Sequence, residues 1–202
     1  MARLNPRETE LCRASTALLL VDMQKLFCMP GLDPDHLELD ARQAVHLQLA
    51  NLVIPNQVAL LVAARASGVQ VIHTIIQSLT EACRDVSLDH RLSGLMVPKS
   101  RPLAGPTDVP APRINEMVIP KTSPGVFNST NIDEVLRNLG VTRLIIAGVV
   151  TINAWIWRYP MRRIGVIWSA CQKMPAPPTQ RRVTGRHRLR LVAIAGSPIP
   201  PQ

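Results

Sequence analysis

An aspartate and a lysine stand at two points of the chain where acid–base chemistry could be carried out. Asp22 follows the apolar run TALLLV, and Lys121 lies in the segment IPKTSPGVFNST. Brought together, the two side chains could activate a nucleophile. The carboxylate would accept its proton, and the positively charged ammonium would stabilise nearby negative charge. The residues alone leave two plainer interpretations open: a helix cap or loop anchor for Asp22, and a solvated charge for Lys121.

Alternating hydrophobic patterns predict the elements that would position these residues. Short apolar or β-branched runs indicate strands over residues 16–22, 69–76, 116–119 and 143–150. Helical spacing covers residues 39–67, with an interruption at Pro55 and a stop at Gly68. Asn131 and Glu134 form a capping-box pattern for a helix that ends at Gly140. Residues 78–115 hold turn formers and prolines and are expected to form a long surface loop.

Strands that alternate with helices predict the fold class. We expect an α/β protein of Rossmann type with three layers, in which a mostly parallel sheet carries helices on both faces. Functional groups in such sheets collect at the carboxyl ends of the strands. The expected site is therefore marked by Asp22 at the end of the first predicted strand, and by Lys121 and Thr151 after the third and fourth.

Length and composition exclude several classes of protein. The 202 residues suit one domain, and 47% hydrophobic content argues against a disordered chain. The apolar runs are shorter than the ~20 residues of a membrane span, and no secretory signal is visible. The four cysteines contain no CxxC pair, which favours a reducing compartment over a disulfide framework or a cysteine zinc site. We expect a soluble cytoplasmic protein.

The net charge of +9 is confined to the last quarter of the chain. Residues 1–151 hold 14 basic and 14 acidic residues, whereas residues 152–202 hold 9 basic residues and no acid. The same last quarter carries all three tryptophans and 7 of the 18 prolines. Composition therefore changes abruptly near Thr151.

Several motifs resemble the isochorismatase-like cysteine hydrolases over about residues 15–151. They are ALLLVDMQKLF, VIPKTSPGVFNST and NIDEVLRNLGVTRLIIAGVVT, in the family's order and spacing. SLTEACRDVSLDHRLSG is most similar to the branch that hydrolyses linear amides and ureides. The resemblance implies a small amide or ureide substrate, no cofactor, and a homo-oligomer in the intact family.

The family triad is Asp, Lys and Cys, and it transfers here only in part. Asp22 and Lys121 match, but Ala154 stands where the cysteine belongs. The resemblance further implies an oxyanion site with a strained, often cis, peptide at Val150–Thr151. It also implies that Gln24 and Phe127 line the pocket, although either could equally be a packed strand-end residue. Without a thiol at position 154, this exact chain is expected to be inactive.

A single lost base in the Thr151 codon would explain the missing cysteine. Read from the last base of that codon, the codons from Ile152 onward permit Asp-Gln-Cys, with the cysteine at position 154. Two residues of this frame are forced by the genetic code and agree with the family: an Asp spanning Trp155 and Ile156, and an Ala spanning Met174 and Pro175. We therefore divide the chain into an incomplete hydrolase domain, 15–151, and an out-of-frame tail, 152–202.

Two alternatives to this account stay open. The tail could be naturally divergent, although Pro160 stands where a helix would run; residues 189–196 do have a strand pattern. The chain could instead be a catalytically dead hydrolase fold whose segment RRVTGRHRLR, with Trp155, Trp157 and Trp168 as stacking residues, binds nucleic acid or an acidic partner. A solvated basic tail without a partner is the simpler expectation. Cys171 is interpreted as a structural or stray thiol.

Histidine spacing gives no support for a metal site. The five histidines form neither an HxH nor an HExxH pattern. Asp33, Asp35 and His36 resemble the metal cluster of nicotinamidases only loosely, and a loop or helix-start role is expected for them. We expect no metal.

Overall fold

The computed structural model describes residues 11–29, 47, 49–149 and 165–171. Its centre is a five-stranded sheet in the order β3-β2-β1-β4-β5, and every neighbouring pair is parallel. The strands are β1 (Thr16–Val21), β2 (Gln70–Ile76), β3 (Met117–Lys121), β4 (Arg143–Gly148) and β5 (Gly165–Cys171). All six residues of β1 are buried, as expected for a central parallel strand covered on both faces.

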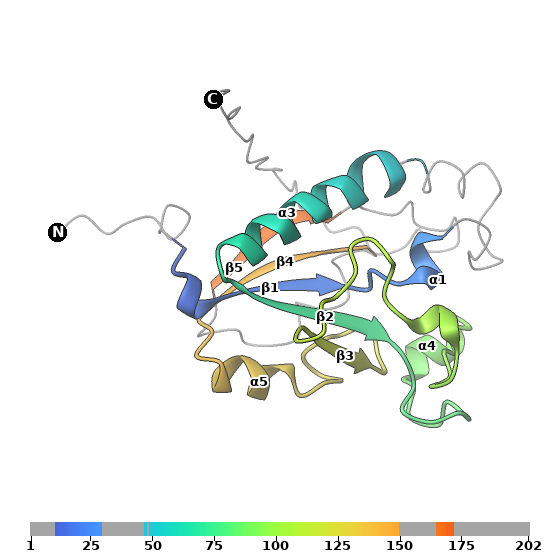
Figure 1. Ribbon diagram of the computed structural model, residues 1–202. Helices are drawn as coiled ribbons and strands as arrows, with labels where there is room; N and C mark the ends of the chain where they lie inside the picture. The colour runs from blue at the N-terminus through green and yellow to red at the C-terminus, as the bar shows by residue number, and fades with distance from the viewer. Residues whose placement is uncertain (1–10, 30–46, 48, 150–164, 172–202) are drawn as a thin grey trace, which may run out of the picture.

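Helices cover both faces of this sheet (Figure 1). α3 (Ile54–Ala66) packs Leu61 and Ala64 against Leu18 and Leu20 of β1. α5 (Ile132–Asn138) packs on the opposite face, where Ile132 and Leu136 join a core cluster with Leu19 and Val21. Because alternate β1 residues point to opposite faces, one apolar strand supports both layers. The predicted three-layer α/β fold is confirmed.

Short helical segments surround this core. They are η1 (Arg13–Ser15), α1 (Lys25–Cys28), η2 (Leu49–Val53), α4 (Leu88–Leu92) and η3 (Pro102–Ala104). α1 and α4 lie beyond the carboxyl ends of the strands in Figure 1. From β1 the strands β2 and β3 follow on one side of the sheet, and β4 and β5 lie on the other side. The direction in which strands are added therefore reverses between β1 and β4. In open α/β sheets, this reversal is where ligands bind.

The long predicted helix differs from the structure at Pro55. The helical path is continuous there, because the π-helical turn η2 leads directly into α3 and Pro55 occupies the first turn of α3. A proline is tolerated in this first turn because its ring fixes φ near the helical value. Residues 39–46 of the predicted helix lie outside the described residues.

The predicted capping box at Asn131 is wrong. Asn131 occupies the N-cap of α5, but its side chain makes no capping hydrogen bond. Instead the Thr130 Oγ1 accepts the Ile132 N–H at 3.1 Å. The third strand also runs further than predicted, so Lys121 is its last residue rather than a residue of the following loop.

The segment predicted as a surface loop, residues 78–115, is a packed cover. It contains α4 and η3, and Val97 and Ala104 are at most 1% exposed. These two side chains cluster with Leu26 and Ile76, which lie just after β1 and at the end of β2. The apolar residues of this cover segment, although scattered among prolines and turn formers, thus pack over the carboxyl ends of β1 and β2.

Part of the predicted tail belongs to the sheet. Residues 165–171 form the edge strand β5 beside β4, whereas residues 150–164 and 172–202 lie outside the described part.

Within the described residues, Leu49–Ala66 is one helical stretch long and apolar enough to cross a membrane by length and composition. Leu61 and Ala64 in this stretch pack on the sheet, as in the covering helix of an α/β domain.

Candidate active site

Asp22 lies directly after β1 in an uncommon backbone conformation. Its φ of 57° falls in the left-handed region, which a non-glycine residue adopts at a cost. The Asp22 N–H donates to the Thr74 carbonyl at 3.0 Å, which holds this conformation against β2. Such strain is concentrated at functional sites, and here it determines where the carboxylate points.

The Lys121 ammonium reaches the Asp22 carboxylate from the end of β3. Lys121 Nζ lies 2.9 Å from Asp22 Oδ2, and the two side chains are only 1% and 2% exposed. The ammonium also donates to the carbonyls of Ser123 and Pro124, at 3.3 and 3.4 Å. Three oxygen acceptors therefore hold the buried cation in place.

The environment of Asp22 suits a residue that takes and returns a proton. Burial raises the pKa of the Asp22 carboxyl, and the nearby Lys121 charge offsets part of this effect. The second oxygen, Oδ1, is buried and has no hydrogen-bond partner among the residues that the structure describes. One oxygen is thus held by Lys121, and the other is free to accept a proton.

Gln24 and Phe127 both occupy packed positions. The Gln24 amide donates to the carbonyls of Ile76 and Ala104 at 3.0 and 2.6 Å, and its oxygen accepts the Ile76 N–H at 2.7 Å. Gln24 thereby fastens the chain after β1 to β2 and to the cover segment. Phe127 belongs to the core cluster on the α5 side of the sheet. These contacts are those of packed strand-end residues.

The end of β4 approaches β1 closely beside Asp22. The Val149 N–H donates to the Val21 carbonyl at 3.1 Å. A Cβ on Gly148 would lie 2.1 Å from that carbonyl oxygen, so only glycine fits. The sequence-predicted residues that follow, Val150, Thr151 and Ala154, lie outside the described residues.

Cys28, on α1 close in sequence to Asp22, is poorly suited to act as a nucleophile. Cys12, Cys28 and Cys83 are free thiols. Burial, and to a lesser degree the Asp22 charge, raises the pKa of the Cys28 thiol to about 12. A thiol that stays protonated is a poor nucleophile.

Sequence reasoning missed His90, which lies on α4 near Lys121. His90 is 2% exposed, and within the described part of the chain its Nδ1 has no hydrogen-bond partner. Burial and the Lys121 charge lower the pKa of His90 to about 4, so the ring is neutral at pH 7. The sequence signal was weak, since a single histidine in SLDHRL follows no metal or catalytic spacing.

Metal ligands are not grouped in the part of the chain that the structure covers. Those residues contain no set of three or more His, Cys, Asp or Glu side chains able to hold an ion. Asp33, Asp35 and His36 fall outside that part.

Comparison with known proteins establishes the class to which this fold and site belong. The isochorismatase domain matches residues 16–153, so the chain belongs to the isochorismatase family. It is 31% identical over 162 residues to the ureidoacrylate amidohydrolase RutB of Agrobacterium fabrum, covering 72% of this chain and 68% of that protein. It is also 32% identical over 145 residues to a protein of Arabidopsis thaliana named as a probable inactive nicotinamidase, covering 69% and 68%.

Solved structures show the same fold. A cysteine hydrolase from Pseudomonas syringae is 28% identical with a TM-score of 0.56, and the match covers 69% of this chain but only 62% of that one. An N-carbamoylsarcosine amidase from Thermoplasma acidophilum has a TM-score of 0.56 at 20% identity, with 76% and 80% covered. At that identity, the second likeness concerns the fold alone.

Proposed function

We propose that the chain carries the site of a hydrolase that cleaves a C–N bond of a small linear amide or ureide. The observation that carries this proposal is the buried Asp22–Lys121 pair, with 2.9 Å between Nζ and Oδ2, at the carboxyl edge of the sheet. The third member of the triad is a cysteine at position 154, where this sequence has alanine. As written, the chain keeps the acid–base pair but lacks the nucleophile.

In the complete triad, the carboxylate and the thiol act in sequence. Asp22 takes the thiol proton on Oδ1, and the thiolate sulfur attacks the substrate carbonyl carbon. As the tetrahedral intermediate collapses, the C–N bond breaks and Asp22 returns the proton to the leaving amine. Water then hydrolyses the thioester, releasing the acid and regenerating the thiol. Lys121 stabilises the ionised form of Asp22 before it takes the proton and after it returns it, and the family resemblance implies that backbone N–H groups at Val150–Thr151 hold the oxyanion.

The relatives support this choice of reaction. RutB is named as a ureidoacrylate amidohydrolase, and the Arabidopsis relative is named as a probable inactive nicotinamidase. The first name supports hydrolysis of a ureide, and the second supports the presence of inactive proteins among this chain's relatives. The substrate itself is the expected small-molecule partner, and the reaction as proposed needs no cofactor.

We attribute the loss of the cysteine to a one-base deletion in the Thr151 codon. The family match ends at residue 153, directly before Ala154. The acidic residues also end before position 152. On this proposal, residues 15–151 are the in-frame part of the domain and residues 152–202 are translated out of frame. The free thiols at Cys12, Cys28 and Cys83 agree with a reducing, cytoplasmic location.

An activity assay of the chain as written tests the assignment of the nucleophile. We expect no release of ammonia from linear amides or ureides. Turnover that survives a thiol-blocking reagent would contradict cysteine chemistry. Turnover that the reagent abolishes would mean that another thiol acts, with Cys171 the first to replace by serine, since its backbone pairs with Gly148 at the end of β4.

A further inference from the structure

The last residue of β2 extends past the end of its neighbour β1. The Asp22 N–H donates to the Thr74 carbonyl at 3.0 Å, directly after β1 ends. Alternate residues of a parallel strand bond to opposite neighbours, and the Gln77 N–H donates to the Lys121 carbonyl of β3 at 3.1 Å. Ile76 lies two residues after Thr74, so its N–H and its carbonyl point toward the β1 side, where β1 has already ended.

The side chain of Gln24 takes the place of the missing β1 backbone. Its amide oxygen accepts the Ile76 N–H at 2.7 Å, and its NH₂ group donates to the Ile76 carbonyl at 3.0 Å. The same NH₂ group donates to the Ala104 carbonyl of the cover segment at 2.6 Å. Gln24 is 0% exposed, and both donor hydrogens of its amide are engaged by backbone carbonyls. No donor of this amide therefore remains for a substrate.

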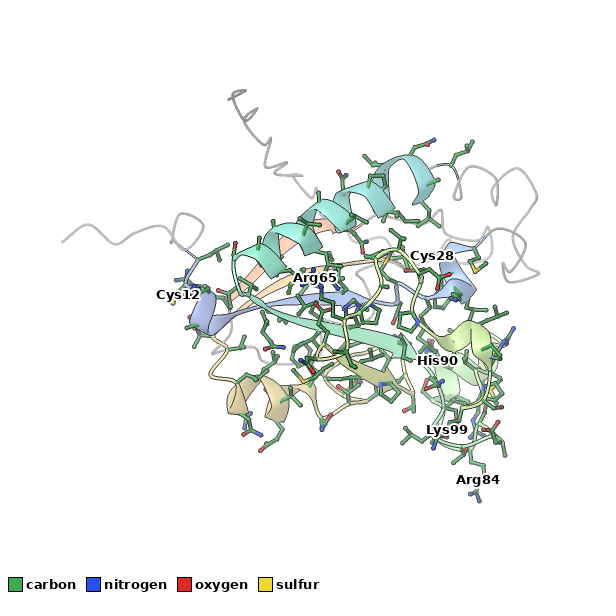
Figure 2. All side chains as sticks on the ribbon, viewed as in Figure 1. Cys12, Cys28, Arg65, Arg84, His90 and Lys99 are labelled. Atoms are coloured by element: carbon green, nitrogen blue, oxygen red, sulfur yellow. The ribbon has the colours of Figure 1, made fainter. Side chains whose placement is uncertain are left out.

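The backbone of Gln24 closes the turn that contains Asp22. The Gln24 N–H donates to the Asp22 carbonyl at 2.8 Å, which makes a γ-turn with Met23 at its centre. The Gln24 carbonyl accepts the Cys28 N–H at 3.0 Å, and Figure 2 shows Cys28 on α1, beyond the carboxyl end of β1. Asp22, with its left-handed φ of 57°, is therefore held between its bond to Thr74 and a turn that Gln24 closes.

We propose that Gln24 is a positioning residue, whose side chain fixes the turn that directs the Asp22 carboxylate toward Lys121. The inference rests on the proposed function, in which Asp22 takes a proton, and it adds a residue that acts only through Asp22. Without the amide, three buried backbone groups of Ile76 and Ala104 would lose their partners, and the turn would have to rearrange to expose them to water. A left-handed aspartate that is no longer held relaxes to a favoured backbone region, which turns its carboxylate away.

The energetic coupling between Asp22 and Lys121 reports whether Gln24 positions the carboxylate. Urea denaturation of the chain as written, of Asp22→Asn, of Lys121→Met and of the double variant gives this coupling. The same four proteins are then compared with Gln24→Met added, because methionine has a similar shape but no amide. We expect the coupling to fall by at least about half in the Gln24→Met background.

Gln77→Met is the matched control. The Gln77 amide also donates to a carbonyl of the cover segment, that of Lys99, at 3.0 Å. Gln77 follows β2, however, and its hydrogen bonds run to Lys99 and Lys121 rather than to the turn after β1. We therefore expect the coupling between Asp22 and Lys121 to be unchanged in the Gln77→Met background.

Hydrogen exchange of backbone amides is the second measurement, for the case in which the combined variants do not fold. In Gln24→Met alone, we expect the Asp22 amide to exchange at least about tenfold faster relative to the Leu20 amide in β1. A loss of overall stability would accelerate both amides alike. Gln24→Glu is the conservative variant: a buried, protonated carboxyl accepts the Ile76 N–H and donates one hydrogen bond, so it should show a smaller local effect of the same sign.

The outcomes separate this inference from the proposed function. An unchanged coupling in the Gln24→Met background would overturn the inference, and so would equal acceleration of the Asp22 and Leu20 amides. Either result would leave the proposed function in place. Absence of coupling between Asp22 and Lys121 in the chain as written would contradict the proposed function, because that pair is the observation that carries it.

Discussion

Lys121 Nζ and Asp22 Oδ2 form a 2.9 Å ion pair from the ends of two strands that are not neighbours in the sheet. β2 lies between their strands, so the Lys121 side chain spans the end of β2 to reach Asp22. Both charges are almost fully buried. Each charge is tolerated there only because the other is present.

Removing one partner of this pair should destabilise the protein strongly. We expect Lys121→Met to lower the free energy of unfolding by about 3–5 kcal/mol, because it leaves the Asp22 charge buried and unpaired. Urea denaturation measures the change. Asp22→Asn is the matching variant, which removes the negative charge of the pair. Asparagine suits this position because it also tolerates the left-handed backbone conformation.

The double variant Asp22→Asn/Lys121→Met tests the coupling. We expect it to be less destabilised than the sum of the two single variants by at least about 1 kcal/mol. Strict additivity would mean that the two charges do not interact in the folded protein.

Gly148 should be intolerant of any side chain. In Gly148→Ala the new Cβ would lie 2.1 Å from the Val21 carbonyl oxygen, so β4 must move away from β1. We expect a loss of about 1–3 kcal/mol or more in the free energy of unfolding, as for an overpacked core. Thermal denaturation measures the change.

Gly68→Ala is the control for backbone conformation alone. Gly68 has φ +69°, but nothing lies within 4 Å of a Cβ built there. We expect this variant to lose only about 1 kcal/mol. A Gly148→Ala variant as mildly affected as Gly68→Ala would contradict the close packing of β4 on β1.

The sequence predicted the sheet well because its strands are continuous apolar runs. β1 and β4 both match their predicted runs to within two residues. The pairing of Asp22 with Lys121 was expected from the rule that strand ends meet at one edge. Its geometry depends on the left-handed Asp22 backbone, which no pattern of residue types indicates.

The cover segment was the main failure of sequence reasoning. Its buried residues, such as Val97 and Ala104, follow neither a helical nor a strand period, so burial there has no local signal. For Gln24 the residues alone left a pocket role and a packed role open, and the hydrogen bonds of its amide to the Ile76 and Ala104 carbonyls could not be read from the sequence because both groups are distant in sequence. The burial of His90 was missed for the same reason, because a single histidine in this segment follows no recognisable spacing.

Acid should remove the stabilisation that Glu116 provides. Arg65 donates hydrogen bonds of 2.7 Å from Nε and from Nη2 to the Glu116 carboxylate and is the main cause that lowers its pKa to about 2, from the usual 4.5. A lowered carboxyl pKa stabilises the fold above the unfolded value, and the effect is lost as the pH falls through the folded value. The stability difference between the unchanged protein and Arg65→Gln, on the order of 2 kcal/mol at neutral pH, should therefore shrink between pH 4.5 and 2.

An exposed ion pair provides the comparison. Arg137 pairs with Asp133 one helical turn away, and its side chain is 68% exposed. Arg137→Gln should change the free energy of unfolding by less than about 0.5 kcal/mol at any pH. If the stability difference between the unchanged protein and Arg65→Gln stayed constant from pH 4.5 to 2, the stabilising role assigned to Glu116 would be wrong.

Any nucleic-acid binding should reside in the basic end of the chain. Residues 1–151 are neutral, and residues 172–202 carry six of the nine basic residues of the last quarter. A truncation after Cys171 retains the residues of β5, and we expect it to weaken binding to a DNA duplex and to reduce its salt dependence. Undiminished binding after truncation would favour a nucleic-acid-binding function for the hydrolase fold itself.

The central claim is that one lost base separates this chain from an active cysteine hydrolase. Restoring a base in the Thr151 codon puts a cysteine at position 154 of the sequence, and on our proposal the buried Asp22 carboxylate then takes the thiol proton. The most direct measurement is iodoacetamide labelling of the repaired protein, read by peptide mass spectrometry beside a ureide hydrolysis assay. We predict preferential labelling at position 154 and ureide hydrolysis that labelling abolishes. A folded repaired protein whose cysteine at 154 is neither labelled nor needed for turnover would contradict the account.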